Sequence, residues 1–142
     1  MSVDIRDARA ADADAIVELI ADLGHSMTAD LVRERINGLA KSGCPQIVAA
    51  IGNRVIGLCG LHIMTAIHCP RPVGRLTILE VAADFRGQGV GRALVEGAAA
   101  RLRDAGCGMI EVTSNERLVG AHDFYRHLGF EHTSKRFVRK LD

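Results

Sequence analysis

The sequence has no tryptophan and only one tyrosine, Tyr125, among its 142 residues. It also has almost no excess charge, because 18 lysines and arginines are balanced by 17 aspartates and glutamates. A nucleic-acid-binding domain normally carries a basic excess, so this balance argues against nucleic acid as a partner. No apolar run approaches the roughly 20 residues that span a bilayer, and the acidic N-terminal segment does not resemble a signal peptide. We therefore expect no membrane association.

The four cysteines, Cys44, Cys59, Cys69 and Cys107, include no C-x-x-C pair. Free thiols in a reducing compartment are the simplest interpretation, which predicts a cytoplasmic protein. Cys59 and Cys69 lie near His62 and His68 in the sequence, but the spacing of these four residues matches no common zinc site. We therefore expect no bound metal.

The chain is about as long as one ordinary domain, and 48% hydrophobic residues are enough for one core. No repeat, low-complexity tract or linker interrupts it, so residues 1–142 are predicted to form a single domain. Two short helices come first, one capped by Asp12 and ended by Gly24, the other capped by Thr28 and ended by Gly43. A third helix ends at Gly106, and a fourth covers residues 118–128.

The predicted strands alternate with these helices and are bounded by turn residues. They cover residues 3–6, 46–51, 54–64, 76–82 and 109–113, with one or two last strands from Phe130 through Val138. The order is β-α-α-β-β-β-α-β-α-β, with room for one more strand. This order predicts an α/β (α+β) fold with one mixed sheet flanked by helices, antiparallel first and parallel around the central crossover.

The glycine-rich segment Arg86-Gly87-Gln88-Gly89-Val90-Gly91 lies between a predicted strand and a predicted helix. Its three glycines let the backbone approach a ligand closely, and the helix start offers unpaired N–H groups and a positive dipole end. Together these features predict a pyrophosphate cradle with Arg86 and Arg92 at its rim. A P-loop would need Gly-Lys-Ser/Thr at the helix start, whereas Arg92 and Ala93 follow Gly91.

A Rossmann dinucleotide site is the other alternative for this turn. Glu111 lies about twenty residues further on, where a ribose-binding acid would stand. However, Leu94 occupies the place of the third glycine. The roughly 30 residues after Glu111 are also too few for the remaining strand–helix units of that fold.

The segment Val81-Ala-Ala-Asp-Phe-Arg86-Gly-Gln-Gly-Val-Gly91-Arg-Ala-Leu94 resembles the acetyl-CoA-binding motif of the GNAT N-acetyltransferase superfamily. The core of that motif is Arg/Gln-x-x-Gly-x-Gly/Ala. A second block, Ala121-His-Asp-Phe-Tyr125-Arg-His-Leu-Gly129-Phe130, is similar to the family's later Ala-x-x-Phe-Tyr-x-x-x-Gly-Phe segment. The resemblance extends over essentially the whole chain, and these two motifs carry its specificity.

The resemblance implies a GNAT-like acyl-CoA-binding fold in which a bulged fourth strand splays from the fifth. The pantetheine arm of acetyl-CoA would then pair with the fourth strand like an added strand, with Val81 at the bulge. The main-chain N–H groups of the glycine-rich turn would hold the pyrophosphate. The expected acetyl-CoA-binding residues are Leu79, Val81, Ala82, Ala83, Arg86, Gly87, Gln88, Gly89, Val90, Gly91, Arg92, Asn115 and His122.

The resemblance also implies direct transfer of an acetyl group from acetyl-CoA to an amine in a ternary complex. Tyr125 matches the tyrosine that protonates the leaving thiolate, and an N–H near Val81 would stabilise the oxyanion. For the general base, three alternatives stay open. They are Glu80, a carboxylate inside an apolar strand beside the thioester site, Glu111, and a chain of ordered waters.

The acceptor is expected to be a small-molecule amine bound between the first two helices and the loop 65–75, with Arg71 and Arg75. A protein N-terminus or lysine is an alternative acceptor, and a non-catalytic acyl-CoA sensor is an alternative function. A homodimer is expected because dimers are common in the family.

Overall fold

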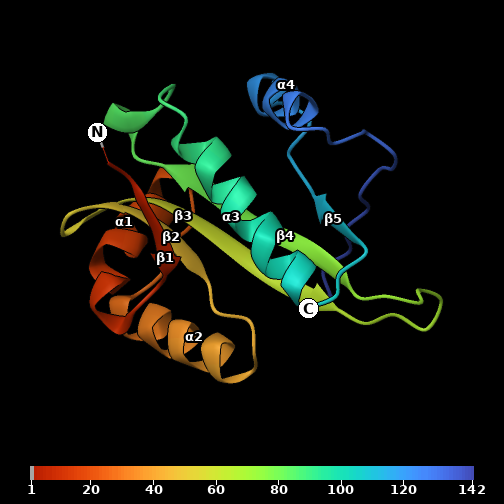
Figure 1. Cartoon of the computed structure of the whole chain (residues 1–142), viewed down its shortest axis with the longest axis horizontal. Coiled ribbons are helices and arrows are strands. Elements are labelled where there is room, and N and C mark those ends of the chain that lie inside the picture. Colours follow the sequence, from red (N-terminus) through yellow and green to blue (C-terminus); the bar gives the residue numbers. More distant parts are fainter. Residues whose placement is uncertain (1) are drawn as a thin grey trace.

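The computed structural model describes residues 2–142, which fold around one five-stranded sheet (Figure 1). The strands lie in the order β1-β2-β3-β4-β5; the first four pair antiparallel and β5 pairs parallel with β4. The strands are β1 (Asp4–Asp7), β2 (Ile47–Ile51), β3 (Arg54–Met64), β4 (Val73–Val81) and β5 (Met109–Val112). The helices are α1 (Ala13–Asp22), α2 (Ala29–Lys41), α3 (Val90–Asp104) and α4 (Val119–His127), with two 3-10 turns, η1 (Ala10–Asp12) and η2 (Ala83–Phe85).

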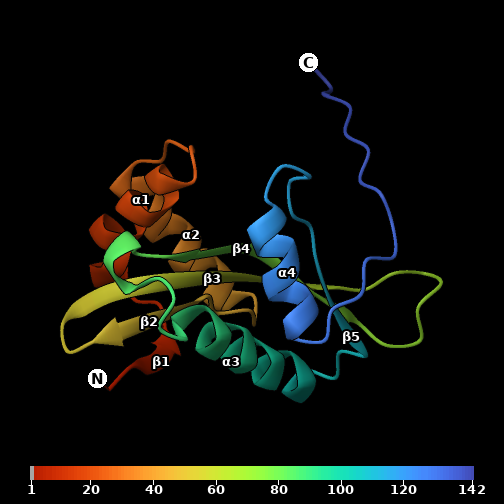
Figure 2. The same ribbon diagram turned by 90° about the horizontal axis from the view of Figure 1, so that it is seen from above.

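The two faces of the sheet carry separate hydrophobic cores because successive strand side chains point to opposite faces. Helices α1 and α2 pack on one face, against Val48, Val55 and Leu58. Helix α3 packs on the other face, where Leu94 and Leu102 are fully buried. Figure 2 shows α1 and α2 on one side of the sheet and α3 on the opposite side. The predicted α/β class, the mixed sheet and the single parallel crossover are therefore confirmed.

Two strand glycines allow α3 to lie unusually close to the sheet. A Cβ atom on Gly74 would lie 2.6 Å from Leu102 Cδ1, and one on Gly57 would lie 2.9 Å from Leu94 Cδ1. Real Cβ atoms do not approach this closely, so a larger residue at either position would push the helix away. This contact fixes where α3 begins relative to the end of β4.

Strand β4 loses one of its two neighbours half-way along its length. It pairs with β5 only from Val73 to Leu76, and then continues to Val81 beside β3 alone. The register moves from Leu61 opposite Leu76 to Gly60 opposite Ile78, so Thr77 is an extra residue and forms a bulge. The bulge was expected at Val81 and lies four residues earlier. It increases the local twist, so the two strands diverge from that point.

Residues 131–142 form no strand, although one or two were predicted from Phe130 onward. Every residue in this segment is exposed, including Phe137, Val138 and Leu141. The reason lies in its composition, since the six residues 131–136 are all polar or charged and offer no apolar face for a sheet to bury. We refer to residues 131–142 as the tail.

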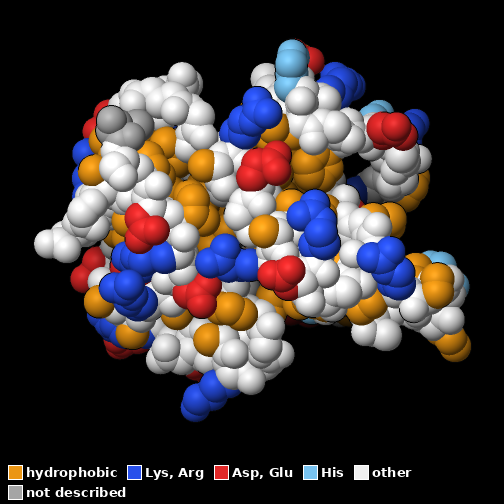
Figure 3. Space-filling model, in the orientation of Figure 1, with side chains coloured by type: hydrophobic (Ala, Val, Ile, Leu, Met, Phe, Trp, Pro, Cys, Tyr) orange, Lys and Arg blue, Asp and Glu red, His pale blue; other side chains and the backbone are white. Residues whose placement is uncertain are grey.

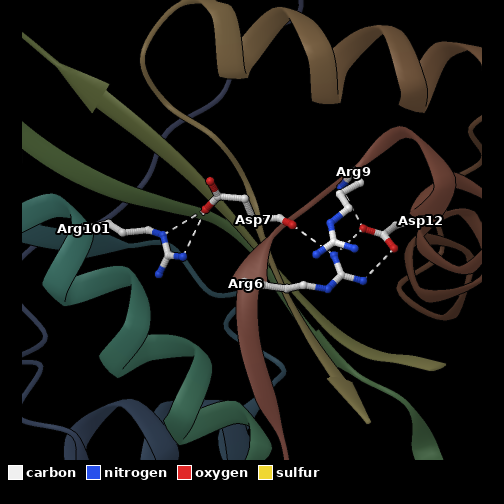
Figure 4. A network of polar contacts seen from close by, with 5 residues as sticks. All are labelled: Arg6, Asp7, Arg9, Asp12 and Arg101. Atoms are coloured by element: carbon white, nitrogen blue, oxygen red, sulfur yellow. Dashed lines mark hydrogen bonds and ion pairs between the residues drawn. The ribbon is translucent and has the colours of Figure 1, made fainter. Parts of the chain in front are cut away.

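A buried ion pair ties β1 to the first helical turn (Figure 4). Asp12 is only 7% exposed, and its carboxylate accepts hydrogen bonds from Arg6 Nη1 at 2.8 Å, Arg6 Nη2 at 2.9 Å and the Arg9 N–H at 2.7 Å. Asp12 was predicted to cap the first helix, but its side chain is turned back to these two arginines instead. On the other side of β1, Asp7 pairs with Arg101 of α3 at 3.1 Å. The predicted Thr28 cap is present, since its hydroxyl accepts from the Leu31 N–H at 3.1 Å.

The Arg6–Asp12 pair predicts a defined loss of stability when the charge is removed. The hydrogen bond from Arg6 is the main reason that the pKa of Asp12 lies below its ordinary value of 3.8. Breaking a largely buried pair costs about 3–5 kcal/mol, so Asp12→Asn should lower the free energy of unfolding by about that amount at pH 7. A carboxylate with a lowered folded-state pKa stabilises the fold above its unfolded pKa and loses this effect as pH falls through the folded value. The difference in free energy of unfolding between the wild type and Asp12→Asn should therefore be equal at pH 7 and pH 5 and shrink below pH 4.

Urea unfolding at these pH values measures the effect. Asp30→Asn is the matched control, because Asp30 pairs with Arg33 but its side chain is 97% exposed, so its removal should change stability little. Equal losses in the two variants would contradict the structural role assigned to Asp12.

Candidate functional site

The edge of β4 beyond the bulge presents backbone groups that no neighbouring strand pairs. The Ala82 N–H donates to the Ile56 carbonyl at 2.8 Å. Because bonded and non-bonded residues alternate along an antiparallel pair, Leu79 and Val81 direct their N–H and C=O groups away from β3, toward the side where β5 has diverged. We call this the free edge of β4. Ala82, which was expected to contribute to the acetyl-CoA site, uses its N–H inside the sheet.

The glycine-rich turn follows the free edge and ends at the start of α3. Gly87 and Gly89 have φ values of 75° and 85°, a left-handed conformation that favours glycine. Within residues 2–142, no N–H group from residue 87 to residue 92 donates to another protein group, and the first helical bond runs from Ala93 to Gly89 at 3.0 Å. The turn therefore presents a run of donors at the positive end of a helix, an arrangement that binds phosphate. The Arg86 N–H is excluded from this set because it donates to the Ala83 carbonyl at 3.4 Å.

The end of this turn touches the helix that carries Tyr125. A Cβ atom on Gly91 would lie 3.3 Å from Phe124 Cζ, so any larger residue would press against α4. The Phe124 ring meets the Tyr125 ring edge-on at 5.3 Å, and Tyr125 meets Phe130 edge-on at 5.6 Å. The Phe130 N–H donates to the Tyr125 carbonyl at 3.0 Å. These contacts fix the only tyrosine of the chain beside the start of α3.

The environment of Tyr125 keeps its hydroxyl protonated. Burial raises the pKa of the Tyr125 phenol, and the nearby thiol of Cys59 raises it further. Cys59 lies opposite Leu79 on β3, and its own burial raises the pKa of its thiol to about 12. At neutral pH both groups are therefore uncharged. A protonated phenol beside the free edge is suited to donate a proton to a leaving group.

Glu80 is buried on the opposite face of β4. It is 8% exposed and lies opposite Leu58, which packs under α1 and α2. Its Oε1 atom accepts the Val81 N–H at 3.0 Å and Arg86 Nη2 at 3.3 Å. The other candidate base, Glu111, lies on the paired part of β5 and faces Arg75, with 3.7 Å between Glu111 Oε1 and Arg75 Nε. Glu80 is therefore the carboxylate that the fold brings to the free edge.

Two other expected ligand residues shape the segment before α4. Asn115 Oδ1 accepts from the Arg117 N–H at 3.0 Å, and the Asn115 carbonyl accepts from the Leu118 N–H at 2.9 Å. His122 Nε2 lies 2.9 Å from the same carbonyl. Asn115 and His122 thus hold each other in a turn, and a role toward acetyl-CoA stays a prediction for both. Val90, Ala83, Gln88 and Arg92 lie at the turn as expected, and Gln88 Nε2 donates to the Asp84 carbonyl at 3.3 Å.

A cavity of about 610 Å³ lies on the same face of β4 as Glu80. Residues of α1, of the β2–β3 turn and of η2 line it, and Ala82 forms part of its wall. Glu18 and Asp22, one helical turn apart on α1, add two carboxylates. No sequence motif indicated this cavity, because solvent-facing acids on a helix are common and the other surfaces that line it are distant in the chain.

The loop before β4 does not line this region, contrary to expectation. It precedes the start of β4, whereas the glycine-rich turn follows the end of this nine-residue strand. In Figure 1 the loop (yellow-green, right) and the turn (green, upper left) lie at opposite ends of the sheet. Arg71 is bound to the turn between α3 and β5, donating from Nη2 to the Cys107 carbonyl at 2.9 Å.

Charge, metal-ligating residues, helix hydrophobicity and cysteines bear on the expectations from composition. Basic and acidic side chains are interspersed over the face in Figure 3. Between residues 2 and 142 the structure gathers no three His, Cys, Asp or Glu side chains into a potential metal site. None of the helices in that range combines the length and the apolar character needed to cross a bilayer. All four cysteines are unpaired with one another.

The sequence model of the Acetyltransferase (GNAT) family matches residues 14–130, from α1 to the end of the α4 motif. The chain belongs to the GNAT acetyltransferase family. An aminoalkylphosphonate N-acetyltransferase of Salmonella typhimurium is 28% identical over 141 residues, covering 97% of this chain and 91% of that protein. An aminoglycoside N(6')-acetyltransferase of Stenotrophomonas maltophilia is 42% identical over 64 residues, covering 45% of this chain and 42% of that protein.

The fold of this GNAT acetyltransferase also matches solved structures. Glucosamine-6-phosphate N-acetyltransferase from Arabidopsis thaliana superposes with a TM-score of 0.87 at 19% identity, covering 100% of both chains. GNAT acetyltransferases use acetyl-CoA as acyl donor, and the site described above fits that molecule. The N–H groups of residues 87–92 suit its diphosphate, and the free edge of β4 suits the amides of its pantetheine arm.

Gly91→Glu should abolish binding of CoA to this acetyltransferase. The new side chain would press on Phe124 and place a carboxylate among the donors meant for a diphosphate, which should weaken binding roughly 100-fold or more. Isothermal titration calorimetry with CoA measures the change. Gly38→Glu is the control, because Gly38 lies in α2 with open space around it. Unchanged CoA affinity in Gly91→Glu would remove the turn from the binding site.

Proposed function

We propose that the chain transfers an acetyl group from acetyl-CoA to a primary amine of a small molecule, by direct attack in a ternary complex. The observation that carries the proposal is the free edge of β4. It ends in an N–H cradle and has Tyr125 beside one face and Glu80 on the other. The names of the relatives support a small acceptor, since one acts on aminoalkylphosphonates and the other on aminoglycosides.

In the proposed reaction the amine nitrogen attacks the thioester carbonyl and forms a tetrahedral oxyanion. Collapse of this intermediate breaks the C–S bond and yields an amide and a thiolate. Tyr125 gives its phenolic proton to the thiolate, and Glu80 takes the proton that the attacking amine releases. N–H groups of the free edge at Leu79 or Val81 stabilise the oxyanion, a contribution of about 3–4 kcal/mol for one well-placed donor.

The acceptor is proposed to approach from the face that α1 and α2 cover. The wall of the cavity includes Ala82, which follows Glu80 by two residues in the chain, so an amine bound there would be near the proposed base. The carboxylates of Glu18 and Asp22 favour an acceptor that carries positive charge. This entry route leaves the opposite face, with Tyr125, to the leaving thiol.

Screening for release of free CoA thiol tests the proposed activity. Acetyl-CoA would be incubated with the protein and a panel of aminoglycosides, polyamines, aminoalkylphosphonates, amino acids and peptides. Turnover with a small amine supports the proposal. Turnover only with peptides would instead assign a protein acceptor, and CoA binding without turnover on any amine would assign a non-catalytic sensor.

Tyr125→Phe should then lower kcat about 10- to 100-fold while the KM for acetyl-CoA changes less than about twofold. Phenylalanine keeps the ring contacts with Phe124 and Phe130, so any loss of kcat is due to the missing hydroxyl alone. Steady-state kinetics on the best acceptor measure both constants. An unaltered kcat would show that Tyr125 is not the acid.

We also propose that the chain forms a homodimer through its tail. Strand β5 pairs with β4 on one side only among the described strands, and Met109 on β5 is 56% exposed. The tail makes no backbone hydrogen bond with residues 2–142, and its apolar side chains at Phe137 and Leu141 are 88% and 93% exposed. The tail of a second copy, added beside β5, would bury these groups and pair the open edge.

Light scattering coupled to size-exclusion chromatography should therefore give the mass of a dimer. The double variant Phe137→Lys, Leu141→Lys should elute as a monomer at the same concentration. Leu23→Lys is the control, because Leu23 is exposed at the end of α1, which packs against β2 and β3 and not beside β5. A monomeric wild-type protein would contradict the proposal.

A further inference from the structure

Both backbone polar groups of Val81 at the free edge are already bonded by side chains of the same chain. The Val81 N–H donates to Glu80 Oε1 at 3.0 Å, and the Val81 carbonyl accepts from Arg86 Nε at 3.2 Å. Arg86 Nη2 also donates to Glu80 Oε1 at 3.3 Å. The three contacts close a ring around the end of β4. They satisfy the groups that a pantetheine arm would otherwise engage.

This ring conflicts with the proposed role of the same groups in donor binding. An incoming strand-like ligand needs the Val81 N–H and carbonyl, which point to the free edge. Arg86 also lies directly before the run of free N–H donors that suits a diphosphate, and its side chain is 54% exposed. Phosphate oxygens compete well for a guanidinium because they accept bidentate, charge-assisted hydrogen bonds.

We propose that Arg86 and Glu80 form a latch that closes the free edge of β4 and that acetyl-CoA must open. The inference rests on the proposed function, and it adds a step that couples the two substrates. When Arg86 turns to the diphosphate, the Val81 carbonyl and N–H become available to the pantetheine arm. Glu80 simultaneously loses its cationic partner.

The release of Glu80 has a chemical consequence. In the closed latch, Glu80 Oε1 is already occupied by the Val81 N–H at 3.0 Å and by Arg86 Nη2 at 3.3 Å, so this oxygen is blocked from an incoming amine. Once Arg86 has turned to the diphosphate, the same oxygen is free to accept a hydrogen bond from the amine. Arg86 is thus a positioning residue that makes the base available only after the donor has bound, and it favours ordered addition with acetyl-CoA first.

The latch predicts how two substitutions combine in CoA binding. Because opening it consumes part of the binding energy, Glu80→Ala should tighten CoA binding roughly three- to fivefold, the range expected for a partly exposed ion pair. Arg86→Ala removes both the latch and a contact to the diphosphate. The loss of CoA affinity caused by Arg86→Ala should therefore be larger in the Glu80→Ala background than in the wild type, by that same factor.

A double-mutant cycle measured by calorimetry with CoA tests this expectation. The matched cycle replaces Glu80→Ala by Asp84→Ala, because Asp84 is another carboxylate near the turn but pairs with Arg54 at 3.0 Å. In that cycle the effects of Asp84→Ala and Arg86→Ala should multiply. A coupling only in the Glu80 cycle supports the latch, and multiplicative effects in both cycles would overturn it.

Two further measurements keep the test decisive. If Glu80→Ala does not fold, Glu80→Gln keeps the size and the acceptor for the Val81 N–H but removes the charge, so the same coupling should appear with a smaller factor. If the wild-type protein binds CoA but the Glu80–Arg86 cycle shows no coupling, only the latch is contradicted. If the wild-type protein does not bind CoA, both the proposed function and the latch are contradicted.

Discussion

The end of strand β4 has to keep one backbone edge unpaired inside a folded domain, and the rest of the site depends on this constraint. The bulge at Thr77 turns β4 away from β5 after Leu76, while β3 continues to hold its other edge. Buried or half-buried backbone groups rarely stay without partners. The edge at Val81 is accordingly bonded by Glu80 and Arg86 in this structure. A site that must accept a strand-like ligand therefore needs replaceable partners, and mobile side chains supply them more readily than a neighbouring strand.

The position of α3 connects this edge to the phosphate-binding turn. Gly57 and Gly74 let Leu94 and Leu102 sit directly on β3 and β4, which fixes the start of α3 beyond the end of β4. Gly91 then brings the first turn of α3 against Phe124. Each of these contacts excludes a side chain of normal size. The donor cradle and the tyrosine helix are thus placed by close packing that extends from the core to the site.

The sequence was sufficient for the elements and motifs that depend on local chemistry. The Thr28 cap, the glycine-rich turn and the parallel crossover were predicted because hydrogen-bonding side chains, glycine and hydrophobic periodicity act over a few residues. The position of the bulge was mispredicted, since it depends on how β3 and β4 align over their full lengths. Asp12 was mispredicted for the same kind of reason. A local cap competes there with Arg6, whose position depends on the pairing of β1 with β2.

Glu80 and Tyr125 lie on opposite faces of the same strand, and the proposed acid–base chemistry depends on this separation. Glu80 lies with Leu58 under α1 and α2, whereas Tyr125 packs with Phe124 and Phe130 on the α3 side. A base and an acid in direct contact would exchange their proton with each other. With β4 between them, the two side chains face different parts of the substrates in the proposed reaction. In the proposed reaction the amine nitrogen and the thioester sulfur occupy different corners of the tetrahedral centre, so a base on one face of the strand and an acid on the other can each reach its own group.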